Sequence, residues 1–151
     1  MFKIKLHVRV HTYNLCGVPP HNKQLFRTYQ VYEPAVPRPQ AINQCMNVGG
    51  RLGEVRNLAQ FGAVLGLTGN GRFWLGGTDP LQDGLTSDFF WPSDMSPVSL
   101  TQFWRQGEPN NFNGGEFCLN FFGGEGMNDA NCAGTFSTLC EFGARGDVPV
   151  C

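Results

Sequence analysis

The chain has 151 residues, of which 41% are hydrophobic and 15% are charged, and its formal net charge at pH 7 is −1. This length suits one domain with a core of its own, and thirteen phenylalanines and three tryptophans exclude a disordered chain. The first 32 residues hold five basic residues and no acidic one, but these are dispersed, so we expect no nucleic-acid partner. No apolar run approaches the ~20 residues that span a bilayer, so we expect no membrane span.

The N-terminal segment predicts two strands. Apolar residues alternate with mostly basic ones over residues 2–13, which is the pattern of a half-buried strand. A loop is expected over residues 14–24, and a second strand over residues 26–32.

Two helices are predicted next. Pro37 and Pro39 introduce the first helix, and Gly49–Gly50 ends it. Its buried stripe is expected to consist of Ala41, Cys45 and Val48. The second helix starts after Asn57, which we expect to cap it, and stops by Gly69. Its apolar face is expected to include Leu58, Phe61 and Leu65.

The chain then becomes irregular. Short aromatic runs alternate with Gly, Asp, Asn and Pro from "RFWLGG" onward, and long irregular loops are usually functional or held by disulfides. Strand-like segments over residues 117–122 and 136–142 close the domain. Strand, helices, loops and short strands in this order predict an α+β fold.

Six cysteines stand at positions 16, 45, 118, 132, 140 and 151. They form no CxxC pair, and the three histidines lie far in sequence from five of them, so a zinc site is disfavoured. An even set of cysteines is typical of disulfides in an oxidising compartment, so we expect a secreted, extracellular protein. The spacing alone does not choose among the fifteen ways to pair six cysteines.

The stretch "GEPNNFNGGEFC" gathers oxygen-bearing side chains without a lysine or arginine. With the later "GMNDANC", it offers three carboxylates and two amides, from Glu108, Asn110, Glu116, Asn128 and Asp129. Hard oxygen ligands in this number suit Ca²⁺, whereas zinc prefers nitrogen and sulfur. A solvated polar loop is the alternative interpretation.

Several motifs around this cluster resemble the carbohydrate-recognition domain of the C-type lectins. The motifs are "FWLGG", "WRQGEPNN", "GEFC", "MNDANC" and "FSTLCEF", with "AINQCMNVGGRL" upstream. The spacings also fit the family: eight from Glu108 to Glu116, twelve from Glu116 to Asn128, and fourteen from Cys118 to Cys132. The resemblance extends from about residue 25 to residue 142.

The resemblance implies an architecture. Residues 25–142 would form the lectin-like domain, with two helices, two small antiparallel sheets and a long irregular calcium-binding loop region. Residues 1–24 would be an N-terminal strand and loop packed on the domain, and residues 143–151 a C-terminal tail. The implied disulfides are Cys45–Cys140 and Cys118–Cys132. Cys16 and Cys151 remain, to join each other or another chain.

The resemblance also implies a function, namely calcium-dependent binding of carbohydrate. Glu108, Asn110, Glu116, Asn128 and Asp129 would hold one Ca²⁺, with Pro109 in a cis bond. Two vicinal hydroxyls of a sugar would complete the coordination shell. The same hydroxyls would form hydrogen bonds with the side chains of Glu108, Asn110, Glu116 and Asn128. In this family Glu-Pro-Asn goes with glycans bearing mannose, fucose or N-acetylglucosamine (GlcNAc). Phe112 is expected to form an apolar wall beside the sugar, with a buried structural role as the alternative.

Three features depart from the family pattern. Met127 replaces a tryptophan, and methionine can fill an apolar gap. An auxiliary Ca²⁺ site would use Asp79, Asp83 and Asn111, but Phe117 stands where a further acid often lies. The segment over residues 83–100 is long for this loop and contains two prolines.

Other functions have weaker support in the sequence. Arg145, Gly146 and Asp147 form a tripeptide that can bind an integrin, although a chance occurrence is favoured. A protein-binding or surface-binding domain on the same fold is the main alternative, because a fold does not fix its ligand. An enzyme is not expected: Glu108 and Glu116 would be bound to metal, and no serine–histidine or cysteine–histidine pair competes. The sequence leaves assembly into homo-oligomers open.

Overall fold

The computed structural model describes residues 3–12 and 25–143. In these ranges the chain forms two α-helices and a mixed sheet, so the predicted α+β class is confirmed. Neither of these helices combines the length and the apolar character that a membrane crossing needs. The predictions for the loop at 14–24, for Cys16 and Cys151, and for the tripeptide at 145–147 lie outside the described residues.

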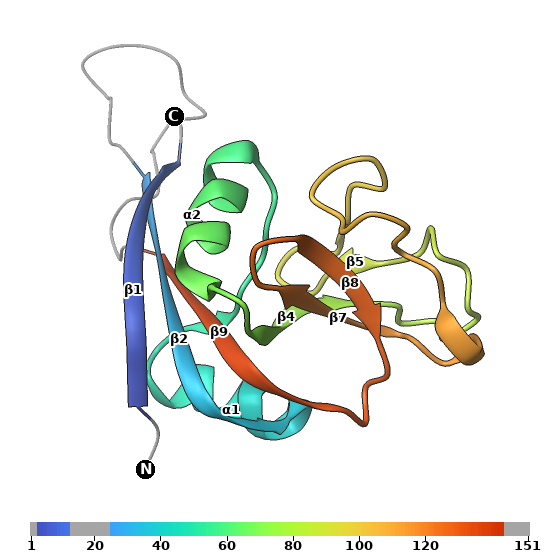
Figure 1. Cartoon of the computed structure of the whole chain (residues 1–151), viewed down its shortest axis with the longest axis horizontal. Coiled ribbons are helices and arrows are strands. Elements are labelled where there is room, and N and C mark those ends of the chain that lie inside the picture. Colours follow the sequence, from blue (N-terminus) through green and yellow to red (C-terminus); the bar gives the residue numbers. More distant parts are fainter. Residues whose placement is uncertain (1–2, 13–24, 144–151) are drawn as a thin grey trace.

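Three long strands form one side of the molecule: β1 (Lys3–Thr12), β2 (Leu25–Pro37) and β9 (Thr135–Gly143). β2 lies in the middle and pairs antiparallel with both neighbours, and the three strands run side by side in Figure 1. Both strands predicted in the N-terminal segment are confirmed. β2 runs farther than predicted and leads directly into the first helix.

The C-terminal half adds a hairpin to this sheet through β4 (Arg72–Thr78). β4 pairs in parallel with β9 and antiparallel with β7 (Cys118–Phe122), which pairs in turn with β8 (Gly126–Ala130). The parallel pairing joins the two expected antiparallel sheets into one mixed sheet. The short elements are β3 (Arg51–Leu52), β5 (Phe90–Trp91), β6 (Ser96–Pro97) and the 3₁₀ turn η1 (Phe112–Gly114).

Helix α1 (Arg38–Asn47) follows β2 without a loop, and prolines stand at its cap and in its first turn, as predicted. Ala41 and Cys45 are fully buried, which confirms that part of the predicted stripe. The prediction for Val48 is wrong, because this side chain is 48% exposed. Val48 is the C-cap residue and lies beyond the last helical turn.

Helix α2 (Leu58–Thr68) begins and ends where the sequence predicts. The Oδ1 atom of Asn57 accepts a hydrogen bond from the backbone N–H of Gln60 at 2.9 Å, and Gly69 is the C-cap residue. Leu58 was expected on the buried face but is 76% exposed. As the first helical residue, it points back beyond the helix end, where the helix has no further turn to cover it. The buried residues of α2 are Gln60, Val64, Leu67 and Thr68. Partly buried are Phe61 and Leu65.

The interior contains two hydrophobic clusters. The larger one lies between α2 and the sheet and includes Phe73, Leu119 and Phe121. Met127 belongs to it and is 0% exposed, so methionine does fill the apolar gap as predicted. The smaller cluster lies under α1 around Trp74, whose Nε1–H donates to the backbone oxygen of Val36 at 2.8 Å.

The structure contains both implied disulfides. Cys45–Cys140 joins α1 to β9 across a sequence separation of 95, and Cys118–Cys132 flanks the β7–β8 hairpin with a separation of 14. The first bond therefore constrains most of the chain, and the second constrains the hairpin that carries the candidate site.

The two disulfides are expected to differ in their contribution to stability. Because the longer loop loses more entropy on closure, replacing Cys45 and Cys140 together with alanine should lower the free energy of unfolding by about 4–5 kcal/mol. Replacing Cys118 and Cys132 together should lower it by about 3 kcal/mol. Urea unfolding of the two double variants and the wild type measures both values. A larger loss for the Cys118–Cys132 pair would contradict the chain-entropy explanation.

Candidate functional site

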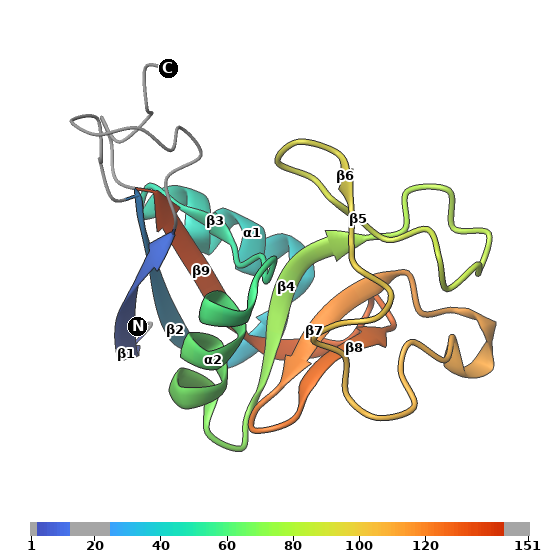
Figure 2. The ribbon, with the colours of Figure 1, turned by 90° about the horizontal axis from the view of Figure 1, so that it is seen from above.

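The candidate site lies in loops that extend from the sheet on the side away from β1 and β2 (Figure 2). The loop over residues 105–117 is fastened at both ends. At its start, the backbone N–H of Met127 donates to the oxygen of Phe103 at 2.7 Å, and the N–H of Arg105 donates to the oxygen of Met127 at 2.8 Å. At its end, the loop enters β7 at Cys118, a cysteine of the second disulfide.

Asp129 of β8 holds the middle of this loop. Its side chain is fully buried, and its Oδ1 and Oδ2 atoms accept the backbone N–H groups of Asn110 at 3.1 Å and Asn111 at 2.6 Å. One carboxyl group thus satisfies two neighbouring backbone N–H groups of the loop. Asp129 therefore fixes the position of the two asparagines relative to the sheet.

The predicted ligands in the loop lie within reach of one another. The backbone N–H of Phe112 donates to Oδ1 of Asn110 and to Oε2 of Glu116, both at 2.9 Å. The Nδ2 group of Asn110 donates to Oε1 of Glu108 at 3.1 Å. The bond between Glu108 and Pro109 is cis, as the resemblance predicts. These contacts turn the three side chains toward one region.

Asn128 approaches the same region from β8. Its Nδ2 group donates to Oδ1 of Asn120 at 3.1 Å and to the backbone oxygen of Asp129 at 2.5 Å. Asn120 is 1% exposed and pairs with Asn128 across the hairpin, yet it is not among the predicted site residues. Its signal was its position two residues after Cys118 on a predicted strand, which places both residues on one face.

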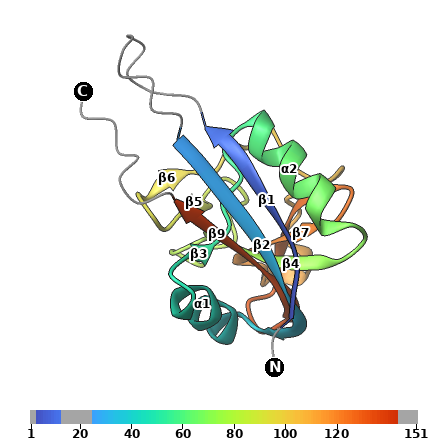
Figure 3. The same cartoon turned by 90° about the vertical axis from the view of Figure 1, so that its left-hand side faces the viewer.

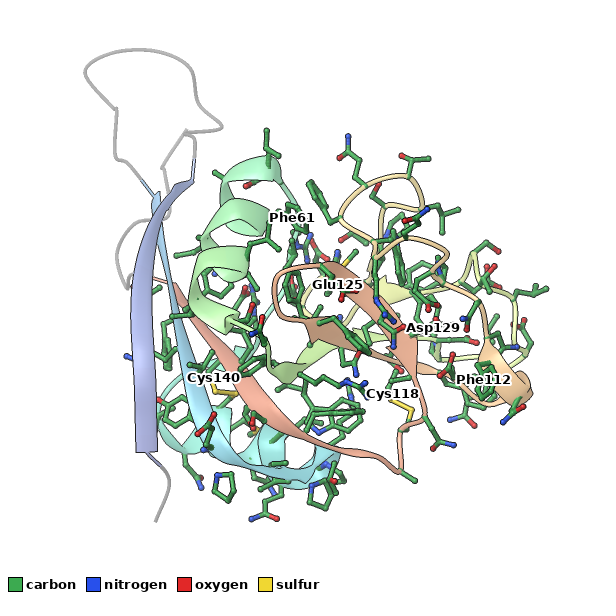
Figure 4. All side chains as sticks on the ribbon, in the orientation of Figure 1. Phe61, Phe112, Cys118, Glu125, Asp129 and Cys140 are labelled. Carbon is green, nitrogen blue, oxygen red and sulfur yellow. A yellow bond between two sulfur atoms is a disulfide. The ribbon has the colours of Figure 1, made fainter. Side chains whose placement is uncertain are left out.

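A hollow of about 330 Å³ connects these residues. Four of the five predicted ligands line it: Glu108, Asn110, Glu116 and Asn128. Asp129 does not line the hollow; Figure 4 shows it nearer the sheet, with Phe112 on the outer part of the loop. Phe112 lines the hollow and is 66% exposed, so the alternative of a buried structural role is wrong.

The site has an excess of negative charge. Burial, together with the nearby carboxylates of Asp129 and Glu116, raises the pKa of Glu108 to about 7, although Arg105 acts in the opposite direction. Burial likewise raises the pKa of Glu116. Arg105 already forms an ion pair with Glu125. The carboxylates therefore bear a mutual repulsion that a cation would remove.

The chemistry of these residues fits a hard cation. The Oε2 atom of Glu108 is buried without a hydrogen-bond partner among the described residues, and buried oxygens are seldom left unpaired. Over the described ranges, no three His, Cys, Asp or Glu side chains are placed to hold a metal ion by themselves. Any cation at this hollow would thus need the amide oxygens of Asn110 and Asn128 as well as carboxylates.

The residues predicted for an auxiliary site make local hydrogen bonds. The Oδ1 atom of Asp79 accepts the backbone N–H groups of Leu81 and Gln82 at 2.9 and 3.0 Å. Asp83 accepts from the N–H of Leu85 at 3.0 Å. Asn111 bridges two loops, because its Nδ2 donates to the oxygen of Gly84 at 3.0 Å and its Oδ1 accepts from the N–H of Glu116 at 3.1 Å.

Comparison with known proteins places the chain in a family. The model of the "Lectin C-type domain" family matches residues 36–142. Ladderlectin from Oncorhynchus mykiss is 34% identical over 117 residues, which cover 73% of this chain and 59% of that protein. Hepatic lectin from Gallus gallus is 30% identical over 102 residues, which cover 68% of this chain and 48% of that protein. The chain thus spans about half the length of these relatives.

A solved structure agrees with this match. The C-type carbohydrate-recognition domain of cow CD23, solved in the presence of a GlcNAc2Man3 oligosaccharide, superposes with a TM-score of 0.67 and 27% sequence identity. The superposition covers 78% of this chain and 88% of that domain. Both disulfides and the order of the helices are those that the family resemblance implies. Together with the match over residues 36–142, they show that the chain belongs to the C-type lectin domain family.

Proposed function

We propose that this protein is a calcium-dependent lectin that binds sugars of the mannose, fucose and GlcNAc type. The observation that carries the proposal is that Glu108, Asn110, Glu116 and Asn128 line one open hollow beside a buried Asp129. These residues come from the loop before β7 and from β8, the strand that follows β7, and two of the carboxylates have raised pKa values. Carboxylates with perturbed pKa values that converge on one hollow are typical of functional sites.

The side chains of the hollow would have two roles, coordination of the cation and hydrogen bonding to the sugar. Glu108, Asn110, Glu116, Asn128 and Asp129 would hold one Ca²⁺, which would supply open coordination positions for two vicinal sugar hydroxyls. The carboxylates of Glu108 and Glu116 would accept hydrogen bonds from those hydroxyls, while the Asn110 and Asn128 amides would donate to the hydroxyl oxygens. The backbone N–H of Phe112 already orients Asn110 and Glu116.

The sugar class follows from the order of these groups. Glu-Pro-Asn at residues 108–110 places a carboxylate before an amide, as in family members that bind equatorial 3- and 4-hydroxyls. The oligosaccharide named for the cow CD23 domain, GlcNAc2Man3, contains two of the proposed sugars. The exposed ring of Phe112 would contact the apolar face of the sugar at the rim of the hollow.

The proposed setting is extracellular. The disulfides Cys45–Cys140 and Cys118–Cys132 support an oxidising compartment. We retain residues 25–142 as the lectin domain, flanked by an extension over 1–24 and a tail over 143–151. A single shallow site predicts weak affinity for one sugar, so clustered glycans or assembly of several chains would supply avidity.

Retention on mannose resin tests the proposal. The wild-type protein should bind in the presence of Ca²⁺ and elute with EDTA or free mannose, but not with galactose. Glu116→Gln should abolish retention and weaken Ca²⁺ binding by at least about tenfold in calorimetry, because a charged ligand oxygen is lost. Asp88→Asn is a matched control that should bind normally, because this carboxylate lies outside the hollow.

Two results would count against the proposal. If the protein stayed on the mannose resin in EDTA, its retention would not depend on a cation. Calorimetry without a Ca²⁺ signal would favour the protein-binding or surface-binding alternative, in which the polar hollow has no metal-dependent role.

Calcium affinity should fall in acid. Protons and the cation compete for Glu108, whose pKa of about 7 is raised by burial and by Asp129 and Glu116, with Arg105 opposing them. Because the raised pKa favours the protonated form below pH 7, binding at pH 6 should release about one proton, and binding at pH 8 close to none. Calorimetry in buffers of different ionisation enthalpy counts these protons. An affinity that stays flat from pH 5 to pH 8 would be inconsistent with this.

A further inference from the structure

A second cavity lies apart from the candidate sugar site. It has a volume of about 290 Å³ and opens where α1, β3 and the end of β4 meet the segment around Pro92. Figure 3 shows α1 and β3 on one side of the molecule and α2 on the other. No residue lines both this cavity and the hollow of the candidate site. The two therefore form separate surfaces.

Most of the cavity wall is apolar. Ile42 and Met46 contribute from α1, one helical turn apart, and Leu52 contributes from β3. Met46 is 64% exposed, and Leu52 is 6% exposed. An apolar surface that remains open beside a fixed backbone is suited to the hydrocarbon part of a ligand.

Two of the charged residues in the wall are already paired. The Nε atom of Arg51 donates to Oε1 of Glu141 at 2.6 Å. Glu54 is 2% exposed, and its Oε2 atom lies 2.6 Å from Nη2 of Arg56. These ion pairs neutralise the carboxylate and one of the two guanidinium groups that line the cavity.

Arg38 is the remaining charged residue in the cavity wall. Its Nη2 donates to the backbone oxygen of Gly76 at 2.9 Å, and its Nε atom is buried without a hydrogen-bond partner. No carboxylate of the described residues forms an ion pair with it. Burial lowers the pKa of Arg38, which reflects the loss of water around its charge. The wall thus presents one uncompensated positive charge next to an apolar surface.

We propose that this cavity binds a small amphipathic carboxylate, such as a medium-chain fatty acid. The carboxylate would pair with the guanidinium of Arg38 through a charge-assisted hydrogen bond. The alkyl chain would lie against Ile42, Met46 and Leu52. A single unpaired positive charge suits a monoanion, and a volume near the lower end of the ~300–1,000 Å³ range of ligand pockets suits a short chain. Binding of the carboxylate at this cavity would require neither calcium nor sugar.

Titration with octanoate in EDTA, below its micelle concentration, tests the proposal by calorimetry. We expect one octanoate per chain. Arg38→Gln should weaken binding by at least about tenfold, because a charge-assisted hydrogen bond is lost, whereas Arg38→Lys should weaken it less. Met46→Glu should also weaken binding, since it adds a negative charge at the exposed edge of the cavity. Arg72→Gln is the matched control: it removes an exposed arginine that lies over the Phe122 ring and outside the cavity, and it should bind like the wild type.

The head group and the location are tested separately. Octanol and octylammonium should bind at least about tenfold more weakly than octanoate if the charge of Arg38 selects the ligand. Amide shifts in NMR spectra should concentrate in residues 38–54 and 76–78. Equal binding of octanol and octanoate, unchanged binding by Arg38→Gln, or shifts confined to other residues would each overturn the proposal. Thermal unfolding of each variant shows whether it remains folded, and the head-group comparison on the wild type needs no variant.

Discussion

The candidate site depends on one buried carboxylate, that of Asp129. This side chain lies on β8, inside the protein, and accepts the backbone N–H groups of Asn110 and Asn111. A hydrogen bond to a charged group contributes about 1.5–3 kcal/mol, and ordering the backbone of one residue costs about 1–2 kcal/mol, so the two bonds offset the ordering of the two asparagines that donate them. The loop is thereby held above the hairpin, and the side chains of Asn110 and Glu116 are oriented by the turn that follows.

The alternation of a five-residue strand explains how β8 performs several tasks. Met127 and Asp129 share one face, where the first packs in the core and the second lies under the loop. Asn128 points to the opposite face, toward the hollow, and its partner across the hairpin is Asn120. Core packing, loop anchoring and ligand presentation therefore share the same backbone. A shift of the register by one residue would place Asn128 in the core and Met127 in the hollow.

Local patterns in the sequence predicted the parts that depend on local physics. The strand over residues 3–12 and the Asn57 cap agree with the structure. The cysteine pairs also agree, but they were implied by the family resemblance and not by any local pattern. The buried face of α2 was predicted less well, because the position of the sheet, and not the helix alone, decides which side is covered. The same limit applies to the β4–β9 pairing and to the ion pair of Arg51 with Glu141, since these join segments far apart in the sequence.

The two surfaces to which we assign ligands share one feature: each contains a charged residue with an unpaired buried atom. Three buried side-chain polar atoms of the described residues have no hydrogen-bond partner, and they belong to Arg38, Gln44 and Glu108. Arg38 and Glu108 line separate hollows, one with a single unpaired positive charge and one with an excess of negative charge. Leaving a buried polar group unpaired costs about 1–3 kcal/mol, more for a charged one, so a folded protein seldom keeps such a group without compensation. A cation beside Glu108 and an anion beside Arg38 would each offset the charge of that residue, and their opposite charges mean that neither ligand could substitute for the other.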